Sequence, residues 1–184
     1  MKNTPRHPLA TVPNCITVLR IAGTIGLLFT APLSAIFFVV YTLCGFTDIL
    51  DGWIARATHS TSELGARLDS IADILFYAVS IIKLLPTLWK LLPTWIWYVV
   101  GGILLLRIVS YVTVAVKFRR FSSVHTRLNK VNGAAVFLLP YFLTPSCAVT
   151  YCIIVCLVSA VAAVHELVLH IANREYHTNM NALF

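Results

Sequence analysis

Charged side chains are scarce in this 184-residue sequence, and acidic ones are scarcest, with only seven in the whole chain. Charged residues make up 11% of the sequence, against about 25% in a typical soluble domain. This scarcity leaves no room for a sizeable soluble domain. No basic polar region with interleaved aromatic residues is present to bind nucleic acid. We therefore expect one membrane domain over residues 1–184, with a cytoplasmic segment at 1–12 and a tail at 173–184.

The cysteines also lack the spacing of metal-binding or redox motifs. The five cysteines form no C-x-x-C pair and each lies in an apolar stretch, which favours small buried side chains over ligands or disulfides. The first apolar run contains Arg20 and is not followed by a small-residue cleavage site. We therefore expect no cleavable signal peptide.

Long apolar runs dominate what remains. The sequence is 59% hydrophobic, its mean hydropathy is +0.84, and about 20 apolar residues suffice to cross the hydrocarbon core of a bilayer. Six stretches qualify or nearly qualify. The fold class that they predict is all-α, an integral membrane bundle of six transmembrane helices over residues 13–30, 32–56, 62–85, 93–117, 128–143 and 147–172. Proline pairs at 86 with 93 and at 140 with 145 are expected to mark turns.

The basic residues predict the orientation of such a bundle, because cytoplasmic loops are enriched in lysine and arginine. With six spans both termini share one side. The opposite side receives only Lys83 and Lys90. The terminal side receives Lys2, Arg6, Arg56, Arg67, Lys117, Arg119, Arg120, Arg127, Lys130 and Arg174. We therefore expect cytoplasmic termini.

All four aspartates fall in one window of 26 residues between two apolar runs. Asp48 and Asp51 are three residues apart and Asp69 and Asp73 are four apart, so each pair shares one helix face. A short turn makes the two helices neighbours, and the pairs can meet. Ionised carboxylates near a bilayer are unfavourable without a cation. The window therefore predicts a site for one or two hard cations, Mg²⁺ or Mn²⁺, open to the cytoplasm.

Glycines and an arginine accompany these carboxylates. Gly52 and Gly65 would let a ligand approach the backbone closely, and Arg56 can present a fork of donors to a phosphate. A purely structural alternative is that the aspartates pair with Arg56, Arg67 or Arg20.

The complete window reads D-x2-D-G-x2-A-R-x8-G-x3-D-x3-D. It resembles the signature of the CDP-alcohol phosphotransferase family, also called CDP-alcohol phosphatidyltransferases. Eight fixed positions carry the resemblance: Asp48, Asp51, Gly52, Ala55, Arg56, Gly65, Asp69 and Asp73.

The resemblance implies a membrane enzyme that moves a substituted phosphate from a CDP-linked donor to an alcohol and releases CMP. It implies that the four aspartates hold two divalent metal ions against the donor diphosphate. It further implies that Asp73 is the general base. Residues implied to bind the cytidine nucleotide are Gly52, Ala55, Arg56 and Gly65. Homodimers are common in the family.

The acceptor alcohol is less clearly marked. The segment 13–20, PNCITVLR, is similar to the start of the first helix in bacterial phosphatidylglycerophosphate synthases, which join CDP-diacylglycerol to glycerol 3-phosphate. Alternatively, Asn14 and Thr17 cap a helix and Arg20 reaches for the membrane surface. Arg107, Arg127 and Lys130 are candidates for binding an anionic acceptor. We expect Arg107 to pair with an aspartate or a phosphate, because an unpaired cation in its apolar run would be unfavourable.

Other acceptors stay open at this point, namely serine, inositol phosphate or phosphatidylglycerol. A divalent-cation transporter is an alternative from a different class, since intramembrane carboxylates also mark ion pathways. No repeat or broken helix places the aspartates at the midplane, which disfavours a transporter. A structural protein with a degenerate site is a third alternative. The sequence predicts a bacterial cytoplasmic-membrane enzyme and gives no role to His125, His165 or Glu166.

Overall fold

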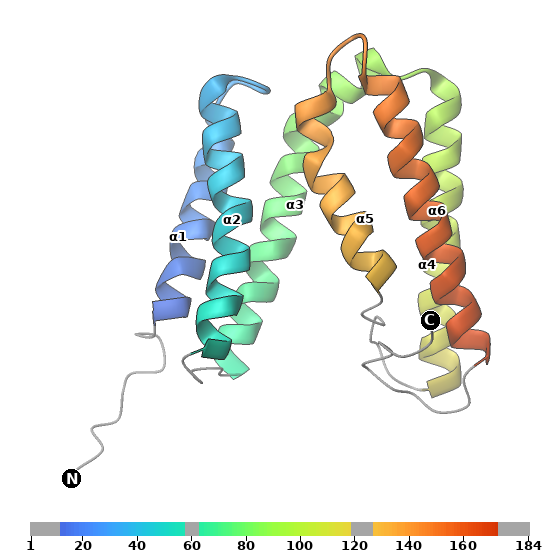
Figure 1. Ribbon diagram of the computed structural model, residues 1–184, viewed down its shortest axis with the longest axis horizontal. Helices are drawn as coiled ribbons and strands as arrows, with labels where there is room; N and C mark the ends of the chain where they lie inside the picture. The colour runs from blue at the N-terminus through green and yellow to red at the C-terminus, as the bar shows by residue number, and fades with distance from the viewer. Residues whose placement is uncertain (1–11, 58–62, 119–126, 173–184) are drawn as a thin grey trace. The chain divides into compact units, whose positions relative to one another are not determined.

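The computed structural model describes residues 12–57, 63–118 and 127–172. Within these ranges the chain is all-helical, as expected, and contains no strand (Figure 1). The elements are α1 (Val12–Leu27), α2 (Ala35–Ala57), α3 (Glu63–Leu91), α4 (Thr94–Phe118), α5 (Arg127–Leu138), the 3-10 helix η1 (Leu139–Phe142) and α6 (Ala148–Ala172). They pack as two units, Met1–Thr87 and Leu88–Phe184.

Three of the described helices are long and apolar enough to cross a membrane. These segments are Arg67–Leu91, Thr94–Thr113 and Ala148–Leu169. Asn14–Leu27 and Ala35–Asp48 are shorter apolar stretches, and α5 has only 12 residues before it tightens into η1. The side chains that α4 exposes are largely apolar, as a lipid-facing surface requires. The chain is therefore a helical membrane protein.

Helix α3 does not end where the sequence predicted. It continues through Pro86 to Leu91, so Pro86 does not mark a turn and the expected end at residue 85 is wrong. Proline removes one backbone hydrogen bond, but membrane helices tolerate that loss because surrounding groups satisfy the freed carbonyl. The turn comes later, where the Ile96 amide donates to the Pro93 carbonyl over 3.1 Å and α4 begins.

The turn between α1 and α2 is longer than expected. Helix α1 ends at Leu27, where the Thr30 hydroxyl donates to the Leu27 carbonyl over 2.8 Å. Helix α2 begins after Ser34, whose hydroxyl oxygen accepts the Phe37 amide over 3.1 Å. Serine is a favoured residue at this capping position. It explains why the helix starts at Ala35 and not at residue 32.

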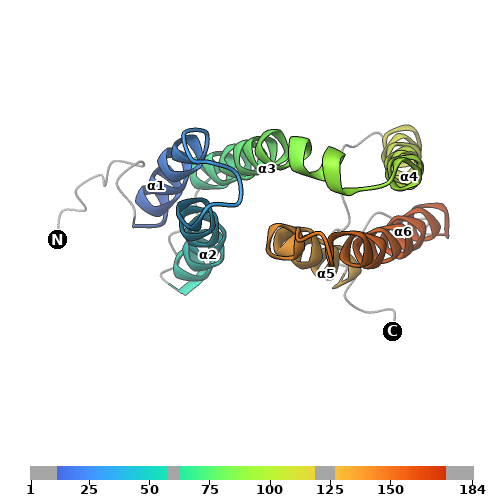
Figure 2. The same ribbon diagram turned by 90° about the horizontal axis from the view of Figure 1, so that it is seen from above.

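In the first unit, α1, α2 and α3 lie side by side (Figures 1 and 2). Aromatic rings join α2 to α3, with the Tyr41 and Phe76 ring centres 5.0 Å apart. Lys83 of α3 donates to the carbonyls of Leu28 and Thr30 over 2.7 and 2.6 Å. These carbonyls follow the end of α1, where a cation is favoured. Lys83 therefore fixes α1 against α3 at the end opposite the aspartate window.

Helices α1 and α2 lie close together at Gly23. A Cβ atom added there would lie 3.0 Å from the Cys44 sulfur. Cys44 also contacts α1 through its thiol, which donates to the Arg20 carbonyl over 3.8 Å, and through the Thr24 hydroxyl at 3.9 Å. Small residues at such a crossing let two membrane helices pack closely. This contact fixes how far α1 is shifted along α2 and how α1 is rotated about its own axis at Arg20.

Alanine substitutions should reveal how tight this crossing is. Gly26→Ala should stabilise the protein, because no atom lies within 4 Å of the added Cβ and alanine favours helix by about 1 kcal/mol. Gly23→Ala should lack this gain or reverse it, because the new methyl group meets Cys44. We expect the free energies of unfolding in detergent to differ by about 1 kcal/mol or more. Adding Cys44→Ala should restore the gain; equal effects at both glycines would contradict a close crossing.

The second unit is built on α6, which packs against α4 and α5. The Tyr151 hydroxyl of α6 donates to the Ala135 carbonyl of α5 over 2.9 Å. Its ring stacks on Phe142 of η1 with centres 4.2 Å apart. The Ser159 hydroxyl donates to the Asn132 side-chain oxygen over 2.5 Å. Polar contacts of this kind between membrane helices set which faces of α5 and α6 meet.

Candidate active site

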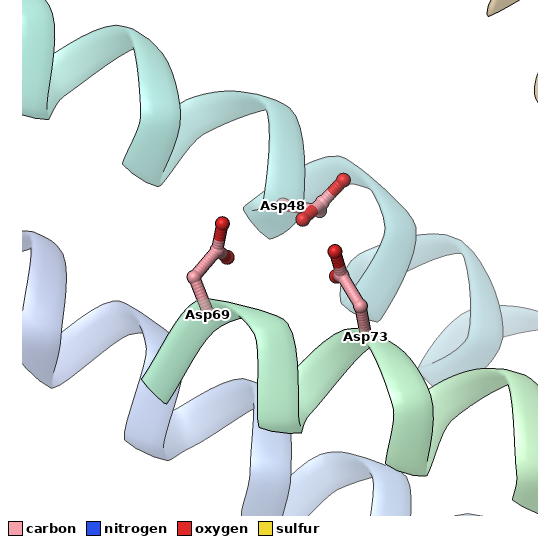
Figure 3. A group of neighbouring side chains, drawn as sticks. All are labelled: Asp48, Asp69 and Asp73. Carbon is pink, nitrogen blue, oxygen red and sulfur yellow. The ribbon is translucent and has the colours of Figure 1, made fainter. Parts of the chain in front are cut away.

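Three of the four aspartates converge in the first unit. Asp48 extends from α2, and Asp69 and Asp73 extend from neighbouring turns of α3 towards it (Figure 3). One carboxylate oxygen of each lies within 4.8 Å of the others. The three side chains are 45%, 46% and 45% exposed. The structure thus supports the inference that the spaced aspartates of two helices can meet on one open face.

Asp51 lies in α2, as the spacing argument requires, but its side chain is outside the described residues. The surroundings of Gly52 and the side chains of Ala55 and Arg56, all in α2, are also outside the described part of the structure. Gly65 lies in the first turn of α3 and is half-buried. The nucleotide-binding role of these residues therefore stays a prediction.

Arg20 of α1 is a member of the cluster, which the sequence named only as one of three possible ion-pair partners of the aspartates. One guanidinium nitrogen, Nη1, donates to the Asp48 carboxylate and, over 3.2 Å, to Asp73. The other, Nη2, donates to Asp69. The Arg20 side chain is 1% exposed. One buried cation therefore contacts three carboxylates that come from two other helices.

Electrostatics explains why a cation lies there. Two unit charges within 4.8 Å of each other repel by about 3.5 kcal/mol or more at an effective dielectric constant of about 20. Three such carboxylates would separate unless a positive charge held them. A planar guanidinium is suited to this role, because its fork of donors matches several carboxylate oxygens in fixed directions.

A spacing signal for Arg20 is present in the sequence. Asn14, Thr17, Arg20 and Thr24 are all at least 96% buried. Steps of three, three and four residues place them on one face of α1. A polar stripe on an otherwise apolar helix indicates a face that packs against protein. Two alternatives were open for Arg20, an ion pair with the aspartates and a position at the membrane surface. The structure shows the ion pair, because Arg20 is a buried partner of the aspartates.

The cluster fits divalent metal ions. Carboxylate oxygens are the ligands that Mg²⁺ and Mn²⁺ prefer. The three described carboxylates supply oxygens from two helices within a span of 4.8 Å, and metal pairs in phosphoryl-transfer sites lie about 3.5 to 4 Å apart. Arg20 contacts the cluster from the protein interior, while each carboxylate remains nearly half exposed. The exposed side is therefore accessible to ions.

The candidate acceptor residues lie in the second unit. Arg107 of α4 faces Glu166 of α6, with 3.9 Å between Nη1 and Oε2. Its described partner is thus a glutamate and not an aspartate, which was one of the two partners expected. Asn129 of α5 also donates to Glu166 over 3.3 Å. Lys130 of α5 is exposed, and the side chain of Arg127 is outside the described residues.

Among the described residues, this buried group keeps hydrogen-bonding capacity. Nη2 of Arg107, Oε1 of Glu166 and Nδ1 of His165 are buried without a hydrogen-bond partner. Glu166 is fully buried. The sequence assigns no role to Glu166 or His165. Glu166 proves to be the counter-charge of Arg107.

Comparison with known proteins identifies the family of the chain. The model of the CDP-alcohol phosphatidyltransferase family matches residues 10–172. The chain belongs to this family. The match includes α1 with Arg20, the whole aspartate window and the Arg107–Glu166 pair. The resemblance drawn from the signature is therefore confirmed for the family.

Several curated proteins are similar to the chain. It is 37% identical over 90 residues to the CDP-diacylglycerol–glycerol-3-phosphate 3-phosphatidyltransferase of Pseudomonas fluorescens, an alignment that covers 45% of this chain and 46% of the relative. Human cardiolipin synthase (CMP-forming) is 34% identical over 107 residues, 55% of this chain and 35% of the relative.

The cardiolipin synthase (CMP-forming) of Streptomyces coelicolor is 32% identical over 139 residues, 71% of this chain and 62% of the relative. In the first two of these alignments the chain spans about half the length of the relative or less. No solved structure matches the chain.

Proposed function

We propose that this chain is a phosphatidyltransferase that moves the phosphatidyl group of CDP-diacylglycerol to a hydroxyl group of glycerol 3-phosphate. The observation that carries the proposal is the convergence of Asp48, Asp69 and Asp73 on one half-exposed face in a member of this family. Relatives named as glycerol-3-phosphate 3-phosphatidyltransferases support the acceptor.

Asp73 accepts the proton of the acceptor hydroxyl in this reaction. The hydroxyl oxygen forms a bond to the phosphatidyl phosphorus, and the bond between that phosphorus and the bridging oxygen of CMP breaks. CMP leaves with the electron pair of the broken bond. Arg20 holds Asp73 within 3.2 Å, which favours a fixed direction of proton transfer.

The four aspartates, Asp48, Asp51, Asp69 and Asp73, would hold two divalent ions, Mg²⁺ or Mn²⁺. Such ions neutralise charge on a diphosphate and on the transferring phosphoryl group. The backbone and side chains at Gly52, Ala55, Arg56 and Gly65 bind the cytidine nucleotide. Their support is the family signature, which fits this chain at every fixed position.

Arg107, Arg127 and Lys130 bind the acceptor. An exposed Lys130 and the partly exposed guanidinium of Arg107 are both suited to a phosphorylated alcohol, since phosphate accepts charge-assisted hydrogen bonds. Arg107 is 21% exposed in its side chain and Glu166 is 1% exposed. Arg107 is therefore the more accessible member of that pair.

We further propose one membrane domain over residues 1–184 with six spans, cytoplasmic termini and an aspartate cluster that faces the cytoplasm. The asymmetry of basic residues supports this orientation. The bacterial relatives favour the cytoplasmic membrane of a bacterium, and homodimers are expected from the family.

A panel of acceptors tests the proposal. Purified chain in detergent micelles with CDP-diacylglycerol and Mg²⁺ or Mn²⁺ should release CMP with glycerol 3-phosphate. It should not do so at a comparable rate with serine, inositol phosphate or phosphatidylglycerol. Mass spectrometry should identify phosphatidylglycerol phosphate as the lipid product, and EDTA should stop its formation. Absence of CMP release with every acceptor would contradict the proposed activity.

A second acceptor is tested separately in this panel. Relatives named as cardiolipin synthases favour phosphatidylglycerol as the alternative substrate of the same reaction. In that case cardiolipin would be the product, and turnover would require phosphatidylglycerol in the micelle. A preference for phosphatidylglycerol would keep the donor and the reaction and would replace only the acceptor.

A further inference from the structure

Arg20 is an unusual side chain among the described residues of the first unit. It is a buried arginine that reaches Asp48, Asp69 and Asp73 across 28, 49 and 53 residues of sequence. No position of the family signature in the aspartate window includes it. Two roles are conceivable for such a cation. It either fills the cluster until metal ions displace it, or it stays and holds the carboxylates in position for them.

The directions of approach distinguish these roles. The Arg20 side chain is 1% exposed, whereas the three carboxylates are 45% to 46% exposed. The guanidinium thus contacts the carboxylates from the interior, and solvent reaches them from the other side. Ions arrive from solvent and can bind on that open side without crossing the position of Arg20.

Packing around α1 also leaves Arg20 little freedom to withdraw. The Cys44 thiol contacts the Arg20 carbonyl at 3.8 Å, and the crossing at Gly23 fixes the distance between α1 and α2. Thr17 and Thr24, one turn away on either side, are 3% and 0% exposed. Moving the guanidinium out would leave a buried cavity or a buried unpaired charge, and both are unfavourable.

We propose that Arg20 is a positioning residue, a permanent internal counter-charge that orients Asp48, Asp69 and Asp73 for divalent metal ions and remains in contact with them after the ions bind. The inference rests on the proposed function for its metal site. It adds a partner that acts on the ligands from behind, as hydrogen-bonding groups around metal ligands commonly do.

The two roles predict opposite changes in metal affinity. If Arg20 positions the ligands, Arg20→Lys should weaken Mn²⁺ binding by about 10- to 100-fold, because lysine keeps the charge and loses the planar fork. If Arg20 is displaced by metal, Arg20→Lys should leave affinity unchanged or raise it. Arg20→Gln removes the competing charge altogether and should raise affinity in the displacement case and lower it in the positioning case.

Electron paramagnetic resonance measures the Mn²⁺ affinity directly. The sample is the purified full chain without donor or acceptor. Arg107→Lys is the matched control, because it alters another poorly exposed, carboxylate-paired arginine and should not change Mn²⁺ affinity. Weaker binding in both Arg20 variants, with the control unchanged, supports positioning. Equal or tighter binding in either folded variant, or no Mn²⁺ binding to the wild type, overturns it.

A measurement on the wild type covers the case in which the Arg20 variants do not fold. In protein labelled with [¹⁵N]arginine, the buried guanidinium should give slowly exchanging signals, and the Arg107→Lys spectrum separates them from those of Arg107, the other poorly exposed arginine among the described residues. These signals should persist when Mg²⁺ is added. Their loss on saturation with Mg²⁺ would show that Arg20 leaves the cluster and would overturn the inference.

These readouts separate the inference from the proposed function. Turnover by the wild type with no effect of Arg20 on metal binding would retain the function and reject the positioning role. Metal binding that depends on Arg20, with no CMP release for any acceptor, would retain the positioning role and reject the function.

Discussion

Asp73→Asn should release CMP about a hundredfold to ten-thousandfold more slowly than the wild type, the range expected when a general base is lost. Asparagine has nearly the same shape as aspartate and keeps an oxygen that can accept a hydrogen bond from Arg20, which lies 3.2 Å from the Asp73 carboxylate. It cannot take up the acceptor proton. Rates should be measured at saturating CDP-diacylglycerol and acceptor.

Donor binding should survive this substitution. Addition of CDP-diacylglycerol should still raise the Tm of the Asp73→Asn protein, because ligand binding to the folded state stabilises it. Recovery of turnover at high Mn²⁺ would instead assign Asp73 to metal binding alone. Ile74→Ala is the control from the same helix, since Ile74 is 71% exposed and apolar. Wild-type rates in Asp73→Asn would exclude Asp73 as the base.

The aspartate cluster could be predicted because its geometry follows from the spacing of residues that are close in sequence. Intervals of three and four residues place side chains on one helix face, and a short connection makes α2 and α3 neighbours. These relations hold for Asp69 and Asp73 whatever the rest of the fold does. In the structure Asp48 of α2 lies opposite this face of α3, as the short connection predicts.

The cation of the cluster could not be assigned in this way. Three arginines were candidates, and the choice of Arg20 depends on how α1 packs against α2 at Gly23 and Cys44. No interval in the sequence encodes that crossing. The buried polar stripe from Asn14 to Thr24 identifies the packed face of α1 but not the element that it faces.

The predicted helix ends were wrong for a different reason. Proline at position 86 looks like a stop signal in a sequence, because it interrupts the backbone hydrogen bonds of a helix. In α3 the apolar run on both sides outweighs this local cost, and the helix continues to Leu91. Ser34 shows the opposite case, since a single capping hydroxyl sets the start of α2.

Removal of the Glu166 carboxylate should strongly destabilise the second unit. Glu166 is fully buried and is the only described carboxylate within 4 Å of Arg107. Glu166→Ala would leave that guanidinium without its described counter-charge, a change that costs about 3 to 5 kcal/mol in buried pairs. It would also remove the acceptor of the Asn129 amide, which donates over 3.3 Å. A lower Tm in detergent is the expected result, and an unchanged Tm would contradict an ion pair of structural importance.

A double substitution separates stability from catalysis at this pair. Arg107→Met with Glu166→Met should recover most of the stability lost in Glu166→Ala, because apolar side chains of similar size often replace a buried ion pair without loss. If Arg107 also binds the acceptor, the recovered protein should still release CMP slowly, with a raised KM for glycerol 3-phosphate and an unchanged KM for CDP-diacylglycerol. If Arg107 serves only to hold α4 against α6, turnover should recover together with the Tm. The acceptor role of Arg107 is therefore decided by the rate of a variant that folds without the pair.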